Sequence, residues 1–512
     1  MKKNIWWIVI GPIIIAIFGT IGYCKTGLPV YTSFVASLDF VLVNFERPAE
    51  NIFVEAARWG GLLYCGTAAI TVVQTAVERL RISKQAKSGQ IVAIHGDGIL
   101  AETLSKNMGA KAMLSNDSRS LAAKTHVILF EDDYDSLDYY HRNMDKLRHA
   151  DKVFLHLSDV QRDKKEVENV VLFNLAENTA RQFWIDNPAY SHEKIVMIGS
   201  GALTENLLTS ALLTNIDEIE NGIEYHIIGD FNEYRALHFN LQDAVEAGKD
   251  KVFFYGDVPW HTLIDVILSA DMIILSQETN DNIHIASKLI NMGLDSNAVS
   301  NGRDTRVFLY TANEKTTLLF DDWIQPFGTA ARMCCEENVM EDWKRTAGII
   351  CNAVYQLGTK THSLNSITAE DVDRYIRSKE GEDDWNRLSD FNRRSNYALS
   401  SHDMHKEKLM NEVGIDSRGL SVGDNDRMFR ALPQEDIDRL QHIEHIRWSR
   451  FLYINNWTYG DERDDQRQVH NYLVKYEDLP DKVRAYDGFF YESLPLRLQL
   501  YPENSPSKKL SM

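Results

Sequence analysis

Two segments of this 512-residue chain share one pattern, and that repeat constrains the fold more than any other feature. In the first segment, the apolar residues 91–94 lead into a turn with Gly96, Gly98 and Ala101 at the small positions of G-x-G-x-x-A. An amphipathic stretch follows. A strand, a glycine turn and a helix in this order predict an α/β fold built on a parallel sheet.

The second copy starts 103 residues further on, with Gly199, Gly201 and Thr204 at the corresponding positions. Threonine is larger than the usual third residue. Short apolar stretches follow both copies, so we predict two tandem Rossmann-like, doubly wound units. The predicted strands are 91–94, 111–114, 127–130, 153–157 and 170–173 in the first unit. In the second unit they are the apolar strand that leads into the Gly199 turn, followed by 224–230, 252–255, 272–275 and 307–310.

Glycine turns of this kind suit a phosphate ligand. The first glycine lets the chain turn, the second lets the backbone approach a pyrophosphate, and the small third residue allows close packing of helix on strand. The backbone N–H groups then face the anion at the positive end of the helix dipole. We therefore expect both turns to bind NAD or another adenine nucleotide, including a nucleotide-derived second messenger.

An acidic residue at the end of the second strand would hold the ribose hydroxyls. Asp117 is the candidate in the first unit, with capping of the next helix as its alternative role. Asp230 is the candidate in the second unit, although it lies further from the turn than usual and a solvated strand end is the alternative. The acids at 131–133 would repel a phosphate from the first turn unless a cation compensates.

Two uncharged runs, residues 5–24 and 59–77, are each about as long as a helix that crosses a bilayer. Lys and Arg flank their outer ends, which predicts a two-pass protein of the inner (plasma) membrane with both termini in the cytoplasm. A cleaved signal peptide is the alternative for the first run, but the run is too long and no A-x-A-like site follows. Residues 31–45 are apolar but too short to span, so they would lie in the interface or re-enter the membrane.

The net charge of the chain limits the binding partners that we expect. The chain has 55 Lys and Arg against 74 Asp and Glu, a net charge of −19, which opposes a general surface for duplex nucleic acid. It does not exclude a small anionic ligand, which needs only a few oriented N–H groups. A nucleotide, the lipid bilayer and further copies of the chain are the expected partners. The five cysteines are scattered and are expected to be reduced, with no metal site.

The chain divides into regions of different pattern. We predict a membrane region at 1–89, a first Rossmann-like unit at 90–190, a second at 191–325, a helical connector at 326–425 and a small, mainly helical domain at 426–502.

The first unit, together with the two apolar runs before it and residues 173–184 that close it, resembles the Trk-type (RCK-like) regulatory domains of potassium channels and transporters. The resemblance implies that the glycine turns bind NAD(H), ATP or related nucleotides, and that occupancy shifts the packing of subunits.

Charged and aromatic residues share one predicted helix near the C-terminus, where Glu444, Arg447 and Trp448 recur on the same face as apolar residues. Burial of both charges is costly unless they pair or meet a ligand. A nucleotide could use such a set, because rings stack a base, Arg holds phosphate and Glu accepts ribose hydroxyls. The alternative is a local ion pair within the core of a small domain.

This segment resembles the ryanodine-receptor repeat domain over about 55 residues, in the order E-H-x-R-W, N-W-x-Y-G, R-D, H, Y-x-x-L-P and Y-D. The matching residues are Glu444, His445, Arg447, Trp448, Trp457, Tyr459, Gly460, Arg463, Asp464, His470, Tyr476, Leu479, Pro480 and Asp487. The resemblance implies a ligand-sensing module, for a nucleotide-derived messenger in an ion-flux or antiviral-defence setting. The expected ligand contacts are Glu444, Arg447, Trp448, Trp457, Tyr459, Arg463 and His470.

Three functions fit these features. The first, which we favour, is a membrane-anchored nucleotide sensor without catalysis, whose ligand acts on the membrane helices. The second is an NAD-dependent oxidoreductase, against which His95 and His226 lie in or beside strands, where core histidines are common. The third is a scaffold whose units only associate.

Overall fold

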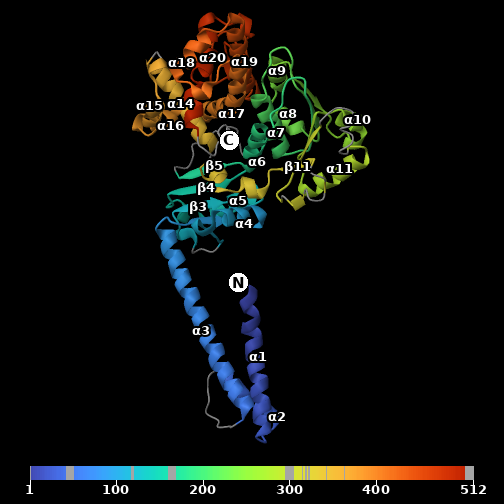
Figure 1. Cartoon of the computed structure of the whole chain (residues 1–512), viewed down its shortest axis with the longest axis vertical. Coiled ribbons are helices and arrows are strands. Elements are labelled where there is room, and N and C mark those ends of the chain that lie inside the picture. The colour runs from blue at the N-terminus through green and yellow to red at the C-terminus, as the bar shows by residue number, and fades with distance from the viewer. Residues whose placement is uncertain are drawn as a thin grey trace. The chain divides into compact units, whose positions relative to one another are not determined.

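The computed structural model of the chain describes residues 2–41, 51–116, 120–158, 169–294, 305–313, 315–316, 320, 323–341, 343–361 and 364–501. They belong to two units, Met1–Ile91 and Val92–Met512 (Figure 1).

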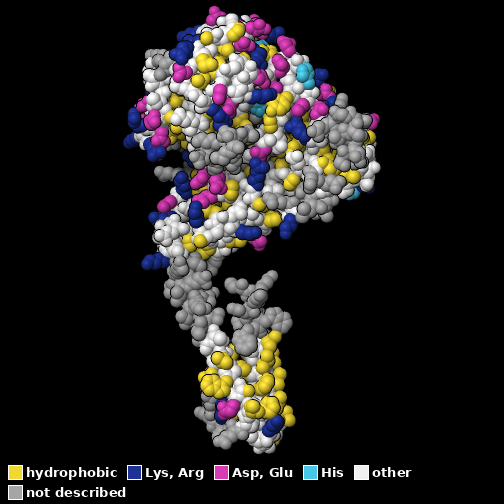
Figure 2. Space-filling view, viewed as in Figure 1, with side chains coloured by type: hydrophobic (Ala, Val, Ile, Leu, Met, Phe, Trp, Pro, Cys, Tyr) yellow, Lys and Arg dark blue, Asp and Glu magenta, His cyan; other side chains and the backbone are white. Residues whose placement is uncertain are grey.

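The first unit consists of three helices, α1 (Lys2–Lys25), α2 (Val30–Val41) and α3 (Ile52–Lys87). Tyr23 and Phe40 stack with ring centroids 5.5 Å apart, and a Cβ on Gly61 would lie 3.0 Å from the carbonyl carbon of Phe40. Glycine is therefore needed where α3 approaches the backbone of α2. Figure 2 shows apolar side chains on the surface of this unit. Its exposed apolar residues include Ile17 and Trp59, which are 51% and 64% exposed.

The prediction of two transmembrane helices at 5–24 and 59–77 is wrong, because no helix in the described part of the chain is long and apolar enough to cross a membrane. The predicted two-pass location in the inner membrane is wrong with it. The run at 59–77 lacks charge but is not uniformly apolar, because seven of its 19 residues are Gly, Thr or Gln. The helices also bring polar groups together, since Thr20 and Ser37 hydroxyls lie 3.1 Å apart and Asn51 donates to the Gly22 carbonyl.

The second unit opens with a parallel five-stranded sheet in the order β2-β1-β3-β4-β5. Its strands confirm those predicted for the first Rossmann-like unit, within one or two residues. They are β1 (Val92–His95), β2 (Ala112–Leu114), β3 (Thr125–Ile128), β4 (Lys152–His156) and β5 (Val170–Phe173).

Helices cover both faces of this sheet. On one face α4 (Gly98–Met108) packs together with α12 (Ala330–Met333) and α13 (Glu336–Val339), which come from much later in the chain. Leu147 of α5 (Asp133–Leu147) packs on the other face. The short helices η1 (Gly109–Lys111) and η2 (Ser120–Ala122) connect the strands. Part of the predicted connector is therefore a layer of the first α/β unit.

A second parallel sheet has six strands in the order β11-β10-β9-β6-β7-β8. Counted from β6 this is 3-2-1-4-5-6, the order of dinucleotide-binding folds. Sequence patterning missed the edge strand β11. The strands are β6 (Lys194–Ile198), β7 (Glu224–Ile228), β8 (Lys251–Phe254), β9 (Met272–Leu275), β10 (Arg306–Tyr310) and β11 (Ile324–Phe327).

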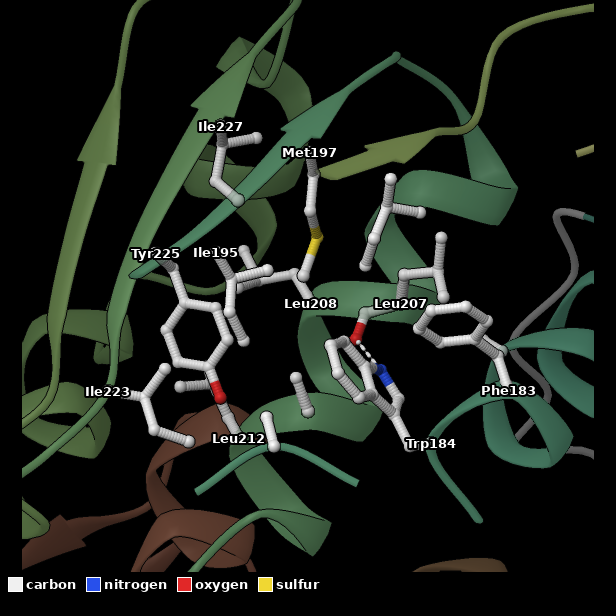
Figure 3. Packing of buried hydrophobic residues seen from close by; sticks show 14 of the residues in the cluster. Phe183, Trp184, Ile195, Met197, Leu207, Leu208, Leu212, Ile223, Tyr225 and Ile227 are labelled. Carbon is white, nitrogen blue, oxygen red and sulfur yellow. Dashed lines mark hydrogen bonds between the residues drawn. The ribbon is translucent and has the colours of Figure 1, made fainter. Parts of the chain in front are cut away.

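Alternate residues of these strands build two cores, as a period of two requires. Ile195 and Met197 face α6 (Leu175–Asp186) and α7 (Ala202–Thr214) (Figure 3). Trp184 falls within the predicted range of the first Rossmann-like unit, 90–190. In the structure it is fully buried in the core of the second sheet, and its Nε1 donates to the Leu207 carbonyl over 2.8 Å. The remaining helices of this sheet are α8 (Asn232–Leu237), α9 (Leu241–Ala247), η3 (Trp260–Leu263), α10 (Ile264–Leu268) and α11 (Thr279–Asn291).

The rest of the second unit is mainly helical. Its elements are α14 (Trp343–Thr361), η6 (Leu364–Ser366), α15 (Ala369–Ile376), α16 (Lys379–Arg387), α17 (Asp390–Glu412), η7 (Ser417–Gly419), α18 (Val422–Arg430), α19 (Gln434–Ile454), β12 (Thr458–Tyr459), β13 (Val469–His470), η8 (Tyr476–Asp478), α20 (Asp481–Glu492) and α21 (Leu494–Leu500). We call this part, from α14 onward, the C-terminal module.

A buried ion pair joins the C-terminal module to the second sheet. Arg450 Nη2 of α19 lies 2.7 Å from Asp250 Oδ2, and both side chains are at most 3% exposed. Arg450 Nη1 also donates to the Leu212 carbonyl of α7, while Asp250 accepts from the Ile223 N–H. Each residue of the buried pair thus has a backbone partner in addition to the opposite charge.

Arg450→Met leaves the Asp250 carboxylate buried without its cation, so we expect a loss of about 3–5 kcal/mol of unfolding free energy. Asp250→Asn in the same chain removes the stranded charge and should restore part of the loss. Urea unfolding of the two variants measures this. Equal stability of the single and double variants would contradict the pairing.

Candidate functional site

The glycine turn of the second sheet lies where the strand order reverses, since β6 pairs with β7 on one side and with β9 on the other. In open α/β sheets ligands bind in the crevice at this point. A Cβ on Gly199 would lie 3.0 Å from the Ser276 backbone and 2.5 Å from Thr204 Oγ1, so only glycine fits. Thr204 is tolerated as the third residue because its buried hydroxyl lies 2.8 Å from that of Ser276.

Gly201 is the most open residue of this turn. Its φ is +78°, and a Cβ there would meet none of the described atoms within 4 Å. It is the N-cap of α7, and its position supplies no side-chain hydrogen bond to the helix. The first N–H groups of an α-helix have no intrahelical partner, so those of α7 are available to a ligand at this open surface.

Asp230 follows β7, the strand next to β6, and its side chain is exposed. One carboxylate oxygen accepts a 3.0 Å hydrogen bond from the N–H of Asn232. Gly229 brings this segment close to the turn, because a Cβ there would lie 2.8 Å from the Gly199 carbonyl carbon. The structure thus places Asp230 beside the second turn, in the position expected of a ribose contact.

The first turn is built differently. Gly96 donates its N–H to Asn116 Oδ1 over 3.0 Å and accepts from Asn116 Nδ2 over 3.1 Å. Ala101 is buried against β1. The carboxylate of Glu131 lies over Gly98. Asp117, the predicted ribose contact, lies outside the described residues.

The two histidines near the turns are bound by neighbouring side chains. His95 Nε2 lies 2.9 Å from His126 Nδ1, and burial lowers the pKa of His95 to about 4. His226 lies 2.7 Å from both the Tyr255 hydroxyl and the Glu224 carboxylate. Both imidazoles are therefore engaged within their sheets.

The predicted charged pair of the C-terminal module is fully buried. Arg447 Nη2 lies 2.6 Å from Glu444 Oε1, and Lys406 Nζ lies 2.9 Å from Glu444 Oε2. The local ion pair that the sequence left as an alternative to ligand binding is thus present. Burial opposes ionisation of Glu444, but the charges of Arg447 and Lys406 outweigh it and lower its pKa to about 2.

Further buried charges extend this network. Asp403 of α17 accepts two hydrogen bonds from Arg497 of α21, at 2.7 and 2.9 Å, and one from the Tyr501 hydroxyl. Asp487 is next to the network, and burial raises its pKa well above the usual value. Arg447 Nη1 and Asp487 Oδ2 have no hydrogen-bond partner among the described atoms.

Sequence reasoning missed the α17 part of this network, Asp403 and Lys406. The usable signal is their spacing of three, which places an acid and a base on the same face of one predicted helix.

The predicted aromatic contacts separate into two groups. Trp448 lies edge-on to His470 at 4.9 Å, and Trp457 stacks on Phe391 at 5.0 Å inside the module. Tyr459 is 55% exposed and donates to Asp461, while Arg463 is at the surface and pairs with Asp465 at 2.6 Å. The structure therefore brings Trp448, Trp457 and His470 together but leaves Tyr459 and Arg463 outside that cluster.

Comparison with known proteins adds no relative. No protein-family model, no curated protein and no solved structure matches the chain. The resemblances to Trk-type domains and to the ryanodine-receptor repeat stay predictions.

The pKa of Glu444 gives a pH test. Because its folded pKa is below the ordinary value of 4.5, the stabilisation is present above about pH 4.5 and is lost as pH falls toward 2. Lys406→Met weakens that effect, so it should cost about 1–3 kcal/mol at pH 7 and less at pH 3. Lys408→Met, on the same helix but with a side chain that is 42% exposed, is the control and should have a smaller effect at both pH values. A pH-independent loss in Lys406→Met would contradict the assignment.

Proposed function

We propose that this chain is a nucleotide sensor without catalytic activity, and that its ligand, NAD or another adenine nucleotide, binds at the second glycine turn. The observation that carries the proposal is the open turn at Gly201, which leads into α7 at the point where the 3-2-1-4-5-6 strand order reverses.

The phosphates would bind the backbone N–H groups at the start of α7. These groups are at the positive end of a 13-residue helix, where the dipole favours an anion. Gly201 leaves room for the phosphate to approach the backbone. Asp230, at the end of the adjacent strand, would accept hydrogen bonds from the ribose hydroxyls.

The other end of α7 contacts the C-terminal module. The Leu212 carbonyl in its last turn accepts from Arg450 Nη1 of α19 over 3.0 Å. The Ile216 carbonyl, just past the helix, lies 3.0 Å from His402 Nε2 of α17. The same two helices carry Glu444 and Lys406 of the buried network.

This arrangement supports coupling between ligand and module. A ligand that prefers one position of α7 shifts the equilibrium by its difference in affinity for the two positions. Because polar contacts fix the far end of α7 to α17 and α19, a displacement of the helix moves buried charges in the module. We therefore propose that the C-terminal module is the part of the chain that responds to the ligand.

A charge placed in the phosphate position tests the site. Ala202 is the first residue of α7, where an added carboxylate suits the helix dipole but repels a phosphate. Ala202→Asp should therefore keep the melting temperature of the free protein and lose nucleotide-induced stabilisation. In the unchanged protein that stabilisation is about 2.7 kcal/mol at a ligand concentration of 100 Kd.

The matched control is Ala202→Asn, which has the same shape without the charge and should retain more of the stabilisation. Thermal unfolding with NAD, ATP and cyclic ADP-ribose measures all three proteins. Equal stabilisation of Ala202→Asp and the unchanged chain would rule out the second turn as the site.

A further inference from the structure

The first glycine turn carries a carboxylate in the place where a phosphate would bind. His95, the last residue of β1, pairs with Ile128 of β3 across the point where the first sheet reverses its strand order. Gly98 is three residues after His95, and Glu131 is three residues after Ile128. A Cβ on Gly98 would lie 2.8 Å from the carboxyl carbon of Glu131 and would collide with its oxygen.

The second turn has the same layout with a different outcome. Ile198 of β6 pairs with Leu275 of β9, Gly201 is three residues after Ile198, and Glu278 is three residues after Leu275. The chain thus has a glutamate at the equivalent position, yet no described atom lies within 4 Å of a Cβ built on Gly201. The two turns of one chain therefore differ in whether the glutamate covers the glycine.

The residues within the turns add to this difference. The first turn is Gly-Asp-Gly, with Asp97 as the N-cap of α4, and the second is Gly-Ser-Gly, with Ser200 at the corresponding position. Asp97 makes no side-chain hydrogen bond to its helix. The start of α4 thus has Asp97 at its N-cap and the Glu131 carboxylate over Gly98, so two acidic residues stand where a phosphate would otherwise bind.

We propose that Glu131 acts as an internal anion that occupies the phosphate position of the first glycine turn. This turn is then a latent nucleotide site that the chain's own carboxylate closes. Asp97 strengthens the exclusion by its charge. The inference rests on the proposed function in so far as the second turn supplies the open site, and it assigns one nucleotide to each chain.

Stoichiometry tests the inference. Calorimetric titration of the full chain with NAD and with ATP should give one nucleotide per chain. Asp97→Ser with Glu131→Ala should give two, because the phosphate position is then open and uncharged as in the second turn. Glu131→Gln, which keeps the size of the side chain and removes its charge, should give weaker binding at the additional site.

Two controls locate the additional site. Glu278→Ala changes the equivalent glutamate of the second unit and should leave one nucleotide per chain. Ala202→Asp combined with Asp97→Ser and Glu131→Ala should bind one nucleotide, now at the first turn.

The outcomes separate this inference from the proposed function. If the unchanged chain binds none and the Asp97→Ser, Glu131→Ala variant binds one, the second turn is not a site but the role of Glu131 stands. Two nucleotides on the unchanged chain would overturn the inference. The inference would also be overturned if the Asp97→Ser, Glu131→Ala variant and Glu131→Gln both keep their melting temperatures and bind no more nucleotide than the unchanged chain.

Discussion

The candidate site depends on a close contact between two stretches of backbone. A Cβ on Gly229 would lie 2.8 Å from the carbonyl carbon of Gly199, so the end of β7 can touch the β6 turn only because residue 229 is glycine. This contact places the start of α7 and Asp230 at one edge of the sheet. A side chain at Gly229 would push the end of β7 away from the β6 turn and so separate Asp230 from the start of α7.

Helix α7 connects that edge to the rest of the unit. It starts at the open turn, packs its apolar face on the second sheet, and ends at carbonyl groups bound by α19 and α17. Those two helices bury a network of opposite charges that includes Glu444, Lys406 and Arg447. Buried ion pairs contribute little net stability compared with apolar residues, but breaking one is costly, so the network favours a defined arrangement.

The sequence predicted the strands well and their surroundings poorly. Alternating and continuous apolar stretches identified all but one of the strands of the two large sheets, because burial on both faces leaves a strong local pattern. Strand order, the cover of the first sheet by α12 and α13, and the burial of Trp184 beside α7 depend on contacts between distant residues. At 59–77 the sequence lacks charge without being uniformly apolar, and absence of charge alone does not predict a membrane-spanning helix.

The candidate site was predicted in part. The glycine spacing identified both turns, but only the structure shows that Glu131 covers Gly98 while Gly201 stays open, since sequence places a glutamate at both equivalent positions. The pairing of Glu444 with Arg447 follows from their spacing of three on a helix. The role of Lys406 does not, because it comes from another helix.

Hydrogen exchange with and without saturating NAD tests the central claim most directly. The account predicts slower exchange at the amides of residues 200–204, a change at 212–216 where α7 meets the C-terminal module, and no change at 96–101. Protection at 96–101 with none at 200–204, or no difference anywhere under saturation by NAD, ATP and cyclic ADP-ribose in turn, would contradict it.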